Sequence, residues 1–312
     1  MSQPTLQDVH VNRPMTEISI KYKNEEFIGE QLFKPIMVNK ESDKYWTYGK
    51  QDFKLYKTKR APGDEARTGG FTIDSDSTYN CDEHAWADII PDRIRENQDE
   101  PINLDIDKTE YCTNVILLDL EDDIRTLAGT SSTYPTGHYE SLSAGDQWDN
   151  NSSDPIKKVR GMLSTIHSKI FIPTKNYSLF ISKDVFDKLV DHPQVIERIK
   201  YSQLGVTTED LLAKLFGVKQ VIVAGAGYDS AAEGQTEVLT YLWSKKVIAA
   251  YVNPNPGLKM LTFGATFRRK GYRQVRKWRE EKKKSDMIEV SDLFDTKVIC
   301  SQAGYLLDNV IA

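Results

Sequence analysis

The sequence predicts a mixed α+β protein, and three observations carry this prediction. The longest helical pattern of the chain lies within residues 101–129. Short strand-like and helix-like stretches alternate from about residue 154 to residue 252, which is typical of a layered fold. Residues 44–80 mix aromatic and basic side chains and break at Pro62-Gly63 and Gly69-Gly70, which predicts a long two-stranded ribbon with a loose tip.

Composition limits the classes of protein. The chain has 312 residues, of which 39% are hydrophobic, enough for one large domain or two ordinary ones. Its 41 Lys and Arg against 46 Asp and Glu leave a net charge of -5, which argues against a general attraction to nucleic acid or anionic membrane. There is no apolar run of the roughly 20 residues that a membrane span needs, and the start does not resemble a signal peptide. We therefore expect the product to stay in the cytoplasm where it is made.

The first 43 residues divide into two parts. Residues 1–26 are polar and have little periodicity, so we expect an extended arm. Residues 27–43 begin with an apolar cluster that predicts a helical turn or two, stopped by Pro35, and then a strand through Val38.

The ribbon of residues 44–80 poses a burial problem. Its large side chains have too polar a surrounding to form a core of their own: Tyr45, Trp46, Tyr48, Phe53, Leu55 and Tyr56. An isolated two-stranded ribbon is marginal in water, and a long polar loop in a compact protein usually has a function. The ribbon either folds back on its own body or lies on another molecule, and we favour the second alternative.

Two helical units are expected after the ribbon. In the first, an apolar stripe at Leu117, Leu120, Ile124 and Leu127 predicts a core-facing helix that ends near Gly129. A loop rich in Ser, Thr, Gly and Asn follows over residues 130–154 and marks a subdomain boundary.

The second unit begins with a helix capped by Asp154. It continues with a strand at 177–182, a helix over 183–201 that is interrupted near Pro193, a helix over 207–217, and strands at 218–225 and 245–252. The tail from residue 286 alternates in the manner of strands that return to the first unit.

The sequence offers little support for catalysis. Gly225-x-Gly227 follows a predicted strand, but Gly234 interrupts the helix that a dinucleotide-binding turn requires, so we interpret the segment as a glycine-rich loop. The five histidines share no metal-ligand spacing, and no Ser lies in a nucleophile elbow. The three cysteines are far apart, and we interpret them as reduced packing residues without a zinc site. Glu121, Asp122 and Asp123 are consecutive on a helix and do not converge, so we interpret them as a solvated face.

A basic stretch runs from Arg268 to Lys284, where ten Lys or Arg stand against Glu280 and Glu281. Its alternation predicts a strand with different chemistry on its two sides. Tyr272 and Trp278 could stack on bases, and long cationic side chains can also cover apolar surface, so subunit contact and nucleic-acid binding both remain open. The candidate residues are Arg268, Arg269, Arg273, Arg276, Lys277 and Arg279.

Several separated stretches together resemble the major capsid proteins of tailed bacteriophages, which have the HK97-type fold. They include "FIGEQLFKPIMVNKESDKYWTYGKQDF", the "RAPGDEA" tip, "DEPINLDIDKTEYCTNVILLDLEDDI", "DQWDNNSSDPI", "LFISKDVFDKLVDHPQVIERIKY" and the final "GYLLDNVI". They occur in the order of the family and cover most of the chain from about residue 24 onward.

The resemblance implies an arrangement of parts. It assigns an N-terminal arm to 1–26, the entry into a peripheral domain to 27–43, an extended E-loop to 44–80, the peripheral domain with its spine helix to 81–145, an axial domain to 146–265, and return strands to 266–312. It gives the ribbon a destination on a neighbouring subunit, with intersubunit contacts at Tyr45, Trp46, Phe53, Leu55, Tyr56, Lys57 and Arg60.

The same resemblance implies a non-enzymatic shell subunit without a cofactor. Such a subunit forms the hexamers and pentamers of a virion capsid around double-stranded DNA and is assembled in the cytoplasm of the host bacterium. Because only a short arm precedes the fold, we expect a separate scaffold protein, with a portal and decoration proteins as further partners.

Some relatives link E-loop lysines covalently to a neighbour, and we predict no such linkage for Lys50, Lys54, Lys57 or Lys59. An encapsulin-type compartment that holds cargo enzyme is the alternative within the fold, and a nucleotide-dependent enzyme built on Gly225 and Gly227 is a third hypothesis.

Overall fold

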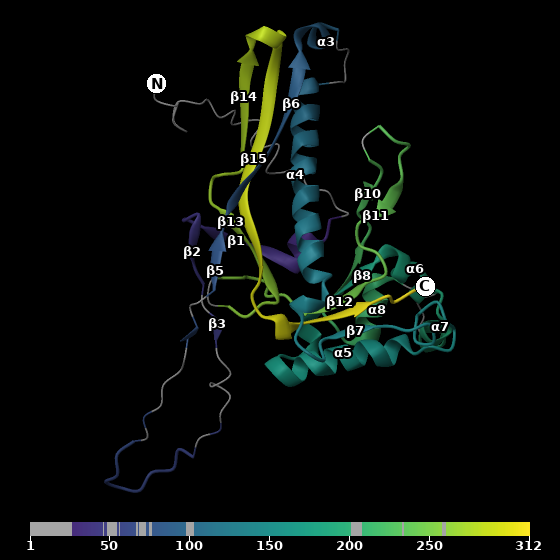
Figure 1. Cartoon of the computed structure of the whole chain (residues 1–312). Coiled ribbons are helices and arrows are strands. Elements are labelled where there is room, and N and C mark those ends of the chain that lie inside the picture. Colours follow the sequence, from purple (N-terminus) through teal and green to yellow (C-terminus); the bar gives the residue numbers. More distant parts are fainter. Residues whose placement is uncertain are drawn as a thin grey trace.

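The computed structural model describes residues 27–45, 47–48, 55, 57–66, 68, 73–74, 77–97, 103–200, 208–232, 234–257 and 260–312. The expected arm, residues 1–26, lies outside this described part. Figure 1 shows an elongated molecule in which a long helix stands beside an upright sheet, a second layered unit lies at the lower end of that helix, and a ribbon extends away from both. Within the described residues, no helix combines the length and the apolar character needed to cross a membrane.

The upright sheet is built around one long strand, β15 (Ser285–Val298). The strand order is β1 (Phe33–Val38), β13 (Gly264–Arg269), β15 and β14 (Gln274–Glu280), and β6 (Asp82–Pro91) pairs with β15 from the other side. β15 pairs with β14 through its first half and with β13 through its second half. The basic stretch therefore includes the end of β13 and all of β14, which pair with β15 and not with each other, and β14 is the strand that the alternation predicts.

The entry segment differs from the prediction in one detail. The helix α2 (Gly29–Leu32) ends before Pro35, which lies within strand β1, so the expectation that Pro35 stops the helix is wrong. Proline lacks an N–H and is tolerated in strands at the edge of a sheet, and β1 is the terminal strand of the sheet order.

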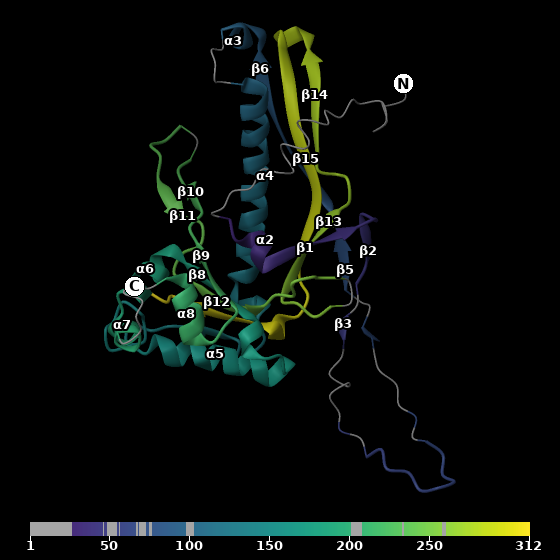
Figure 2. The same cartoon turned by 180° about the vertical axis from the view of Figure 1, so that it is seen from behind.

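The long helix α4 (Leu104–Ala128) covers one face of the upright sheet (Figure 2). Asn103 caps its first turn by accepting a hydrogen bond from the backbone N–H of Ile106. The predicted stripe is buried at Leu117, Leu120 and Ile124. A short helix, α3 (Asp92–Glu96), joins β6 to the segment that leads into α4.

The second unit has a sheet of order β7 (Tyr139–Ser141), β16 (Gly304–Asp308), β12 (Val247–Tyr251), β8 (Tyr177–Ser182) and β9 (Gln220–Ala224). Its helices are α5 (Pro155–Ile170), α6 (Lys183–Val190), α7 (Pro193–Ile199) and α8 (Glu209–Phe216). Asp154, Pro155 and Thr208 start their helices as predicted, and the helix expected over 183–201 is interrupted at Pro193.

The last strand corrects the predicted division of the chain. β15 returns to the upright sheet as expected, but β16 joins the second sheet between β7 and β12. A short 3-10 turn at Ser301–Ala303 redirects the chain, and Gly304 follows it where a Cβ would overlap the buried ring of Phe263. The assignment of all residues 266–312 to the first unit is therefore wrong for the last strand. Further 3-10 turns lie at Ser131–Thr133, Thr174–Asn176 and Glu281–Lys283.

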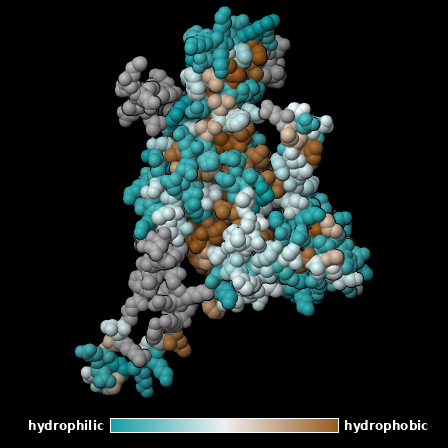
Figure 3. All heavy atoms as spheres, in the orientation of Figure 1, coloured by the Kyte–Doolittle hydropathy of each residue, from teal (hydrophilic) through white to brown (hydrophobic). Residues whose placement is uncertain are grey.

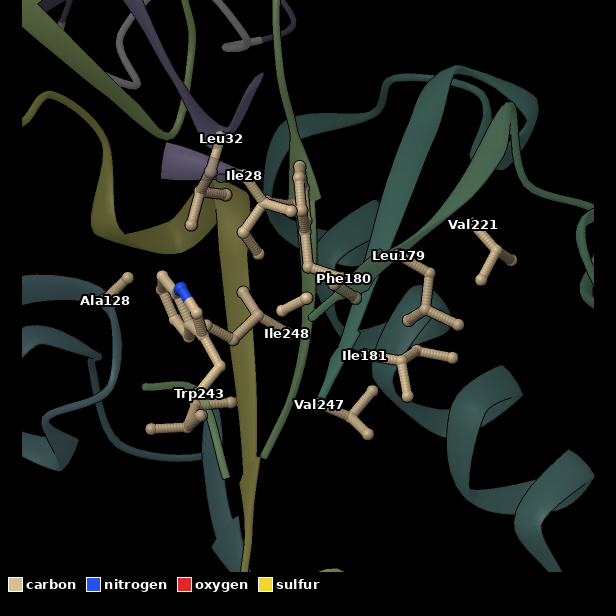
Figure 4. Packing of buried hydrophobic residues seen from close by; sticks show 14 of the residues in the cluster. Ile28, Leu32, Ala128, Leu179, Phe180, Ile181, Val221, Trp243, Val247 and Ile248 are labelled. Carbon is tan, nitrogen blue, oxygen red and sulfur yellow. The ribbon is translucent and has the colours of Figure 1, made fainter. Parts of the chain in front are cut away.

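One continuous core joins the two units. Figure 4 shows Ile28 and Leu32 of the entry segment close to Phe180 of β8 and Ile248 of β12, with Trp243 and Ala128 nearby. All six residues of β8 are buried, which is expected for a central strand covered on both faces. The entry segment and the end of α4 therefore pack directly against the sheet of the second unit, and these apolar side chains are buried.

Two hairpins project from this body. The ribbon consists of β2 (Ser42–Lys44) paired with β5 (Thr78–Asn80), followed by β3 (Thr47–Tyr48) paired with β4 (Ile73–Asp74). The second hairpin pairs β10 (Gly227–Asp229) with β11 (Leu239–Tyr241).

Candidate intersubunit surface

The base of the ribbon packs on its own subunit. Tyr45 and Tyr79 lie against Phe267 of β13, with ring centroids 5.3 Å and 4.6 Å from it. Together with Ile36 and Val38 they belong to a small second core. Tyr45 is only 6% exposed, so the prediction that it contacts a neighbouring subunit is wrong. The physical reason is that β1 and β13 offer an apolar surface at the point where the ribbon leaves the sheet.

The tip of the ribbon lies away from this core. Figures 1 and 2 both place it far from the two sheets. Leu55 is 101% exposed, and each residue from 57 to 66 is exposed. The described part of the tip is mostly hydrophilic (Figure 3). The structure thus leaves Leu55, Lys57 and Arg60 available for a contact, whereas Trp46, Phe53 and Tyr56 lie outside the described residues.

The first arginine of the basic stretch is a core residue. The side chain of Arg268 is 8% exposed, and its Nη1 donates to Glu30 Oε1 at 2.9 Å. Its Nε lies 3.0 Å from Oδ2 of Asp292, which is 2% exposed, although the two groups are not aligned as a hydrogen bond. The prediction that Arg268 faces DNA or another subunit is wrong, because its charge is neutralised inside its own subunit.

Four of the other five basic candidates also find carboxylates within the subunit. Arg269 pairs with Glu41 and stacks on the ring of Tyr272, 3.9 Å from its centroid. Burial, together with the nearby Arg268, lowers the pKa of Arg273. Three further pairs are Arg276 with Glu289 at 3.7 Å, Lys277 with Asp105 at 3.0 Å, and Arg279 with Asp92. For these four cations, the expectation that they meet carboxylates on neighbours is therefore corrected, whereas for Arg273 it stays a prediction.

Three of the neutralising carboxylates come from strand β15, immediately after the basic stretch. Asp286, Glu289 and Asp292 lie on β15, beside β14 and β13. The excess of Lys and Arg over Glu was counted from Arg268 to Lys284, and this range ends just before these acidic residues begin. Hairpin pairing is the signal that would have found them, because antiparallel neighbours bring oppositely charged side chains within reach.

Asp286 gives this network a pH dependence. Burial alone would raise the pKa of Asp286, but hydrogen bonds from Arg95 and Arg279 outweigh it and lower the pKa. A carboxyl with a lowered folded pKa contributes stability above its unfolded pKa of about 3.9. That contribution is lost as the pH falls through the folded value.

The Asp286→Asn variant is therefore expected to lose roughly 1.5–3 kcal/mol of unfolding free energy at pH 7, the usual range for hydrogen bonds to charged groups. The difference from the parent should shrink as the pH falls from the unfolded pKa of about 3.9 through the lower folded pKa, because the parent's carboxyl takes up a proton first in the unfolded and then in the folded state. Urea unfolding at pH 7, 5 and 3 measures this, with Asp64→Asn at the exposed ribbon tip as the control. A difference that stays constant with pH would contradict the assignment.

Sequence reasoning missed the role of Glu121. It is 2% exposed and accepts hydrogen bonds from the backbone N–H of Ile28 at 3.1 Å, from that of Gly29 at 2.6 Å, and from Nε1 of Trp243 at 2.6 Å. Burial raises the pKa of Glu121, although these three hydrogen bonds act to lower it. The interpretation of this residue as part of a solvated face is wrong.

The available signal was the position of Glu121 on the helix. It lies four residues after Leu117 and three before Ile124, on the buried stripe, whereas Asp122 is half exposed and pairs with Arg125. A charged residue on an apolar stripe should be expected to meet buried donors.

The glycine-rich segment and the buried cysteines have structural roles. After Gly225 the chain enters the β10–β11 hairpin, not a helix, so this segment is no dinucleotide-binding turn. Burial raises the pKa of Cys81 and of Cys112 to about 11, which keeps both thiols protonated and confirms them as packing residues. Across the described part of the chain, no group of three or more His, Cys, Asp or Glu side chains could hold a metal ion.

Similarity to a phage protein shows the family of this chain. The major capsid protein of Burkholderia phage BcepMu is 30% identical over 307 residues, which cover 96% of each chain. The chain belongs to the phage major capsid proteins. No family model matches the sequence of this capsid protein. Its relative is a structural protein of the virion shell, and the predicted resemblance is confirmed.

Solved structures agree on the fold. The capsid protein superposes on a phage-related protein from Bordetella bronchiseptica with a TM-score of 0.79 and 26% identity, covering 97% of this chain and 98% of the other. It superposes on the capsid structure of cyanophage P-SCSP1u with a TM-score of 0.62 and 13% identity, covering 92% and 89%. The predicted HK97-like α+β fold is confirmed.

Proposed function

We propose that copies of this capsid protein form hexamers and pentamers that close into an icosahedral head around double-stranded DNA. The observation that carries the proposal is the exposed tip of the ribbon. The base of the ribbon is anchored by Tyr45 and Tyr79, whereas Leu55 and residues 57–66 lie in solvent. A two-stranded ribbon is marginal by itself, so a neighbouring subunit is the surface that stabilises this tip.

Such a contact uses different surfaces on the two partners. Contacts of this kind generate closed rings when the rotation closes, and rings joined at their edges form a shell. Each interface can be weak because many act together in the closed lattice. The further partners in this proposal are a separate scaffold protein, a portal and decoration proteins, and assembly takes place in the cytoplasm of the host bacterium.

The second candidate within the fold is a compartment that holds cargo enzyme. Nucleic acid distinguishes the two, because a phage head protects double-stranded DNA from added nuclease and a compartment of that kind contains protein. The BcepMu relative, a major capsid protein, favours the phage head.

Charge reversal at the tip tests the proposal. Lys57→Glu combined with Arg60→Glu is expected to abolish shells, because both cations are exposed and would then repel the carboxylates that they meet on a neighbour. Negative-stain images and sedimentation measure assembly, and circular dichroism measures folding. The matched control reverses Lys214 and Lys219, two exposed cations on the second unit. Normal shells from the tip variant would count against the role of the ribbon.

A further inference from the structure

The β10–β11 hairpin exposes apolar side chains that its own subunit does not cover. Leu239 is 79% exposed, Val238 51% and Tyr241 45%. The turn is nevertheless well defined, because Asp229 accepts hydrogen bonds from the backbone N–H of Ala231 at 2.9 Å and of Val238 at 2.8 Å. An ordered hairpin that displays apolar side chains is typical of a protein contact surface.

The charge of this hairpin has one sign. Residues 227–241 contain Asp229, Glu233 and Glu237 and no Lys or Arg. Its partner should therefore be a surface that combines positive charge with room for apolar side chains.

The outward face of α5 has this composition. Residues 155–170 contain no Asp or Glu, and Lys157, Arg160 and Lys169 are exposed. No ion pair involves these three cations among the described residues, whereas Lys158 of the same helix pairs with Glu140 at 2.6 Å. Within the part of the subunit that the structure describes, no carboxylate pairs with these three positive charges.

Two residues at this face are unfavourable for the stability of the isolated subunit. Gly161 lies inside the helix, where glycine destabilises by about 1 kcal/mol relative to alanine, although a Cβ there would meet nothing within 4 Å. Phe171 follows the helix in the left-handed region with φ of 54° and is 61% exposed, a conformation that a bulky residue rarely adopts. A glycine at position 161 would let another molecule approach the helix closely. An exposed phenylalanine at position 171 would give that molecule an apolar contact.

The two surfaces lie at opposite ends of the second unit. Figures 1 and 2 place the hairpin at its upper end and α5 at its lower end, so the two cannot meet within one subunit. They can meet between two subunits that are related by rotation, where the same contact then repeats around a ring.

We infer that the β10–β11 hairpin of one subunit docks on the outward face of α5 in the next subunit of the ring. Leu239 and Val238 lie over the small residues Gly161 and Ser164, and Glu237 lies near Arg160. This inference rests on the proposed assembly into rings, and it adds a contact that is distinct from the ribbon.

A bulky residue at the centre of the face tests the contact. Gly161→Leu is expected to leave the subunit at least as stable as the parent, because leucine is a better helix former and the site is open. Shell yield should fall by at least about tenfold, which corresponds to 1.4 kcal/mol. Lys188→Leu, which adds a leucine at an exposed site on α6, is the control and should assemble normally. Normal shell yield from Gly161→Leu would overturn the inference.

Cross-linking separates failure of this contact from failure of the proposed function. The double variant Leu239→Cys and Ser164→Cys, oxidised in assembled particles, should give a ladder of linked subunits up to the ring size. Each single-cysteine variant is a control for links through the native Cys81, Cys112 and Cys300, which are buried or half-buried. Intact shells without a ladder would overturn the contact alone. A parent protein that forms no rings would overturn the proposed function and this inference with it.

Discussion

Replacing Arg268 by alanine is expected to lower the free energy of unfolding by about 3–5 kcal/mol, the usual effect of removing one partner of a buried ion pair. Asp292, 2% exposed, would lose the guanidinium 3.0 Å from it, and Glu30 would lose its hydrogen bond. Burial already raises the pKa of Asp292, and the attraction of Arg268 opposes that rise. The variant should therefore unfold at a lower urea concentration than the parent.

Two comparisons make this prediction specific. Lys297→Ala removes a cation whose side chain is 41% exposed and whose partner is Asp295, and it should change stability by less than about 1 kcal/mol. The double variant Arg268→Met and Asp292→Leu removes both charges and should recover much of the lost stability. If Arg268→Ala were as mild as Lys297→Ala, Arg268 would not have the buried structural role assigned to it.

The second large effect is expected at Glu121. Glu121→Ala leaves three buried donors without an acceptor: the backbone N–H groups of Ile28 and Gly29, and Nε1 of Trp243. An unsatisfied buried donor costs roughly 1–3 kcal/mol, so the variant should lose about 4 kcal/mol in chemical denaturation. These donors belong to the entry segment and to the second unit, and Glu121 belongs to α4. The substitution should therefore weaken the packing of the entry segment and of the second unit against α4.

The neighbouring residue is the matched control. Asp122→Ala removes a carboxylate that is 49% exposed and pairs with Arg125 one turn along, so its effect should stay within about 0.5 kcal/mol. Glu121→Gln should lie between the two, because the amide keeps one acceptor oxygen but directs an N–H group toward a backbone donor. Equal stability of the alanine variants at 121 and 122 would refute the role of Glu121.

Much of the fold follows from local sequence signals. The stripe of Leu117, Leu120 and Ile124 predicts α4, and Asp154 followed by Pro155 predicts the start of α5. These signals are readable because helix periodicity and capping involve residues only a few positions apart. The projecting ribbon is predictable for the same reason, since its composition shows that it has no core of its own.

The candidate site was harder to predict because its contacts are distant in sequence. Tyr45 was expected on a neighbour and lies on Phe267 of its own subunit, whose strand is more than two hundred positions away. The last strand was expected in the upright sheet and pairs instead with β12 and β7. A strand pattern shows that a segment will pair, but it does not name the partner strand.

By itself, the sequence determined the class of the fold, the extents of the main helices and the existence of a ribbon that extends beyond its own core, because each depends on residues close together in the chain. Only the tertiary structure decided which charges are neutralised within the subunit. Arg268 meets Glu30 across 238 positions, and Glu121 meets Gly29 across 92. Electrostatic and hydrogen-bond partners are set by distance in space, so the basic stretch could be assigned to the interior only once the strands and helices were placed together.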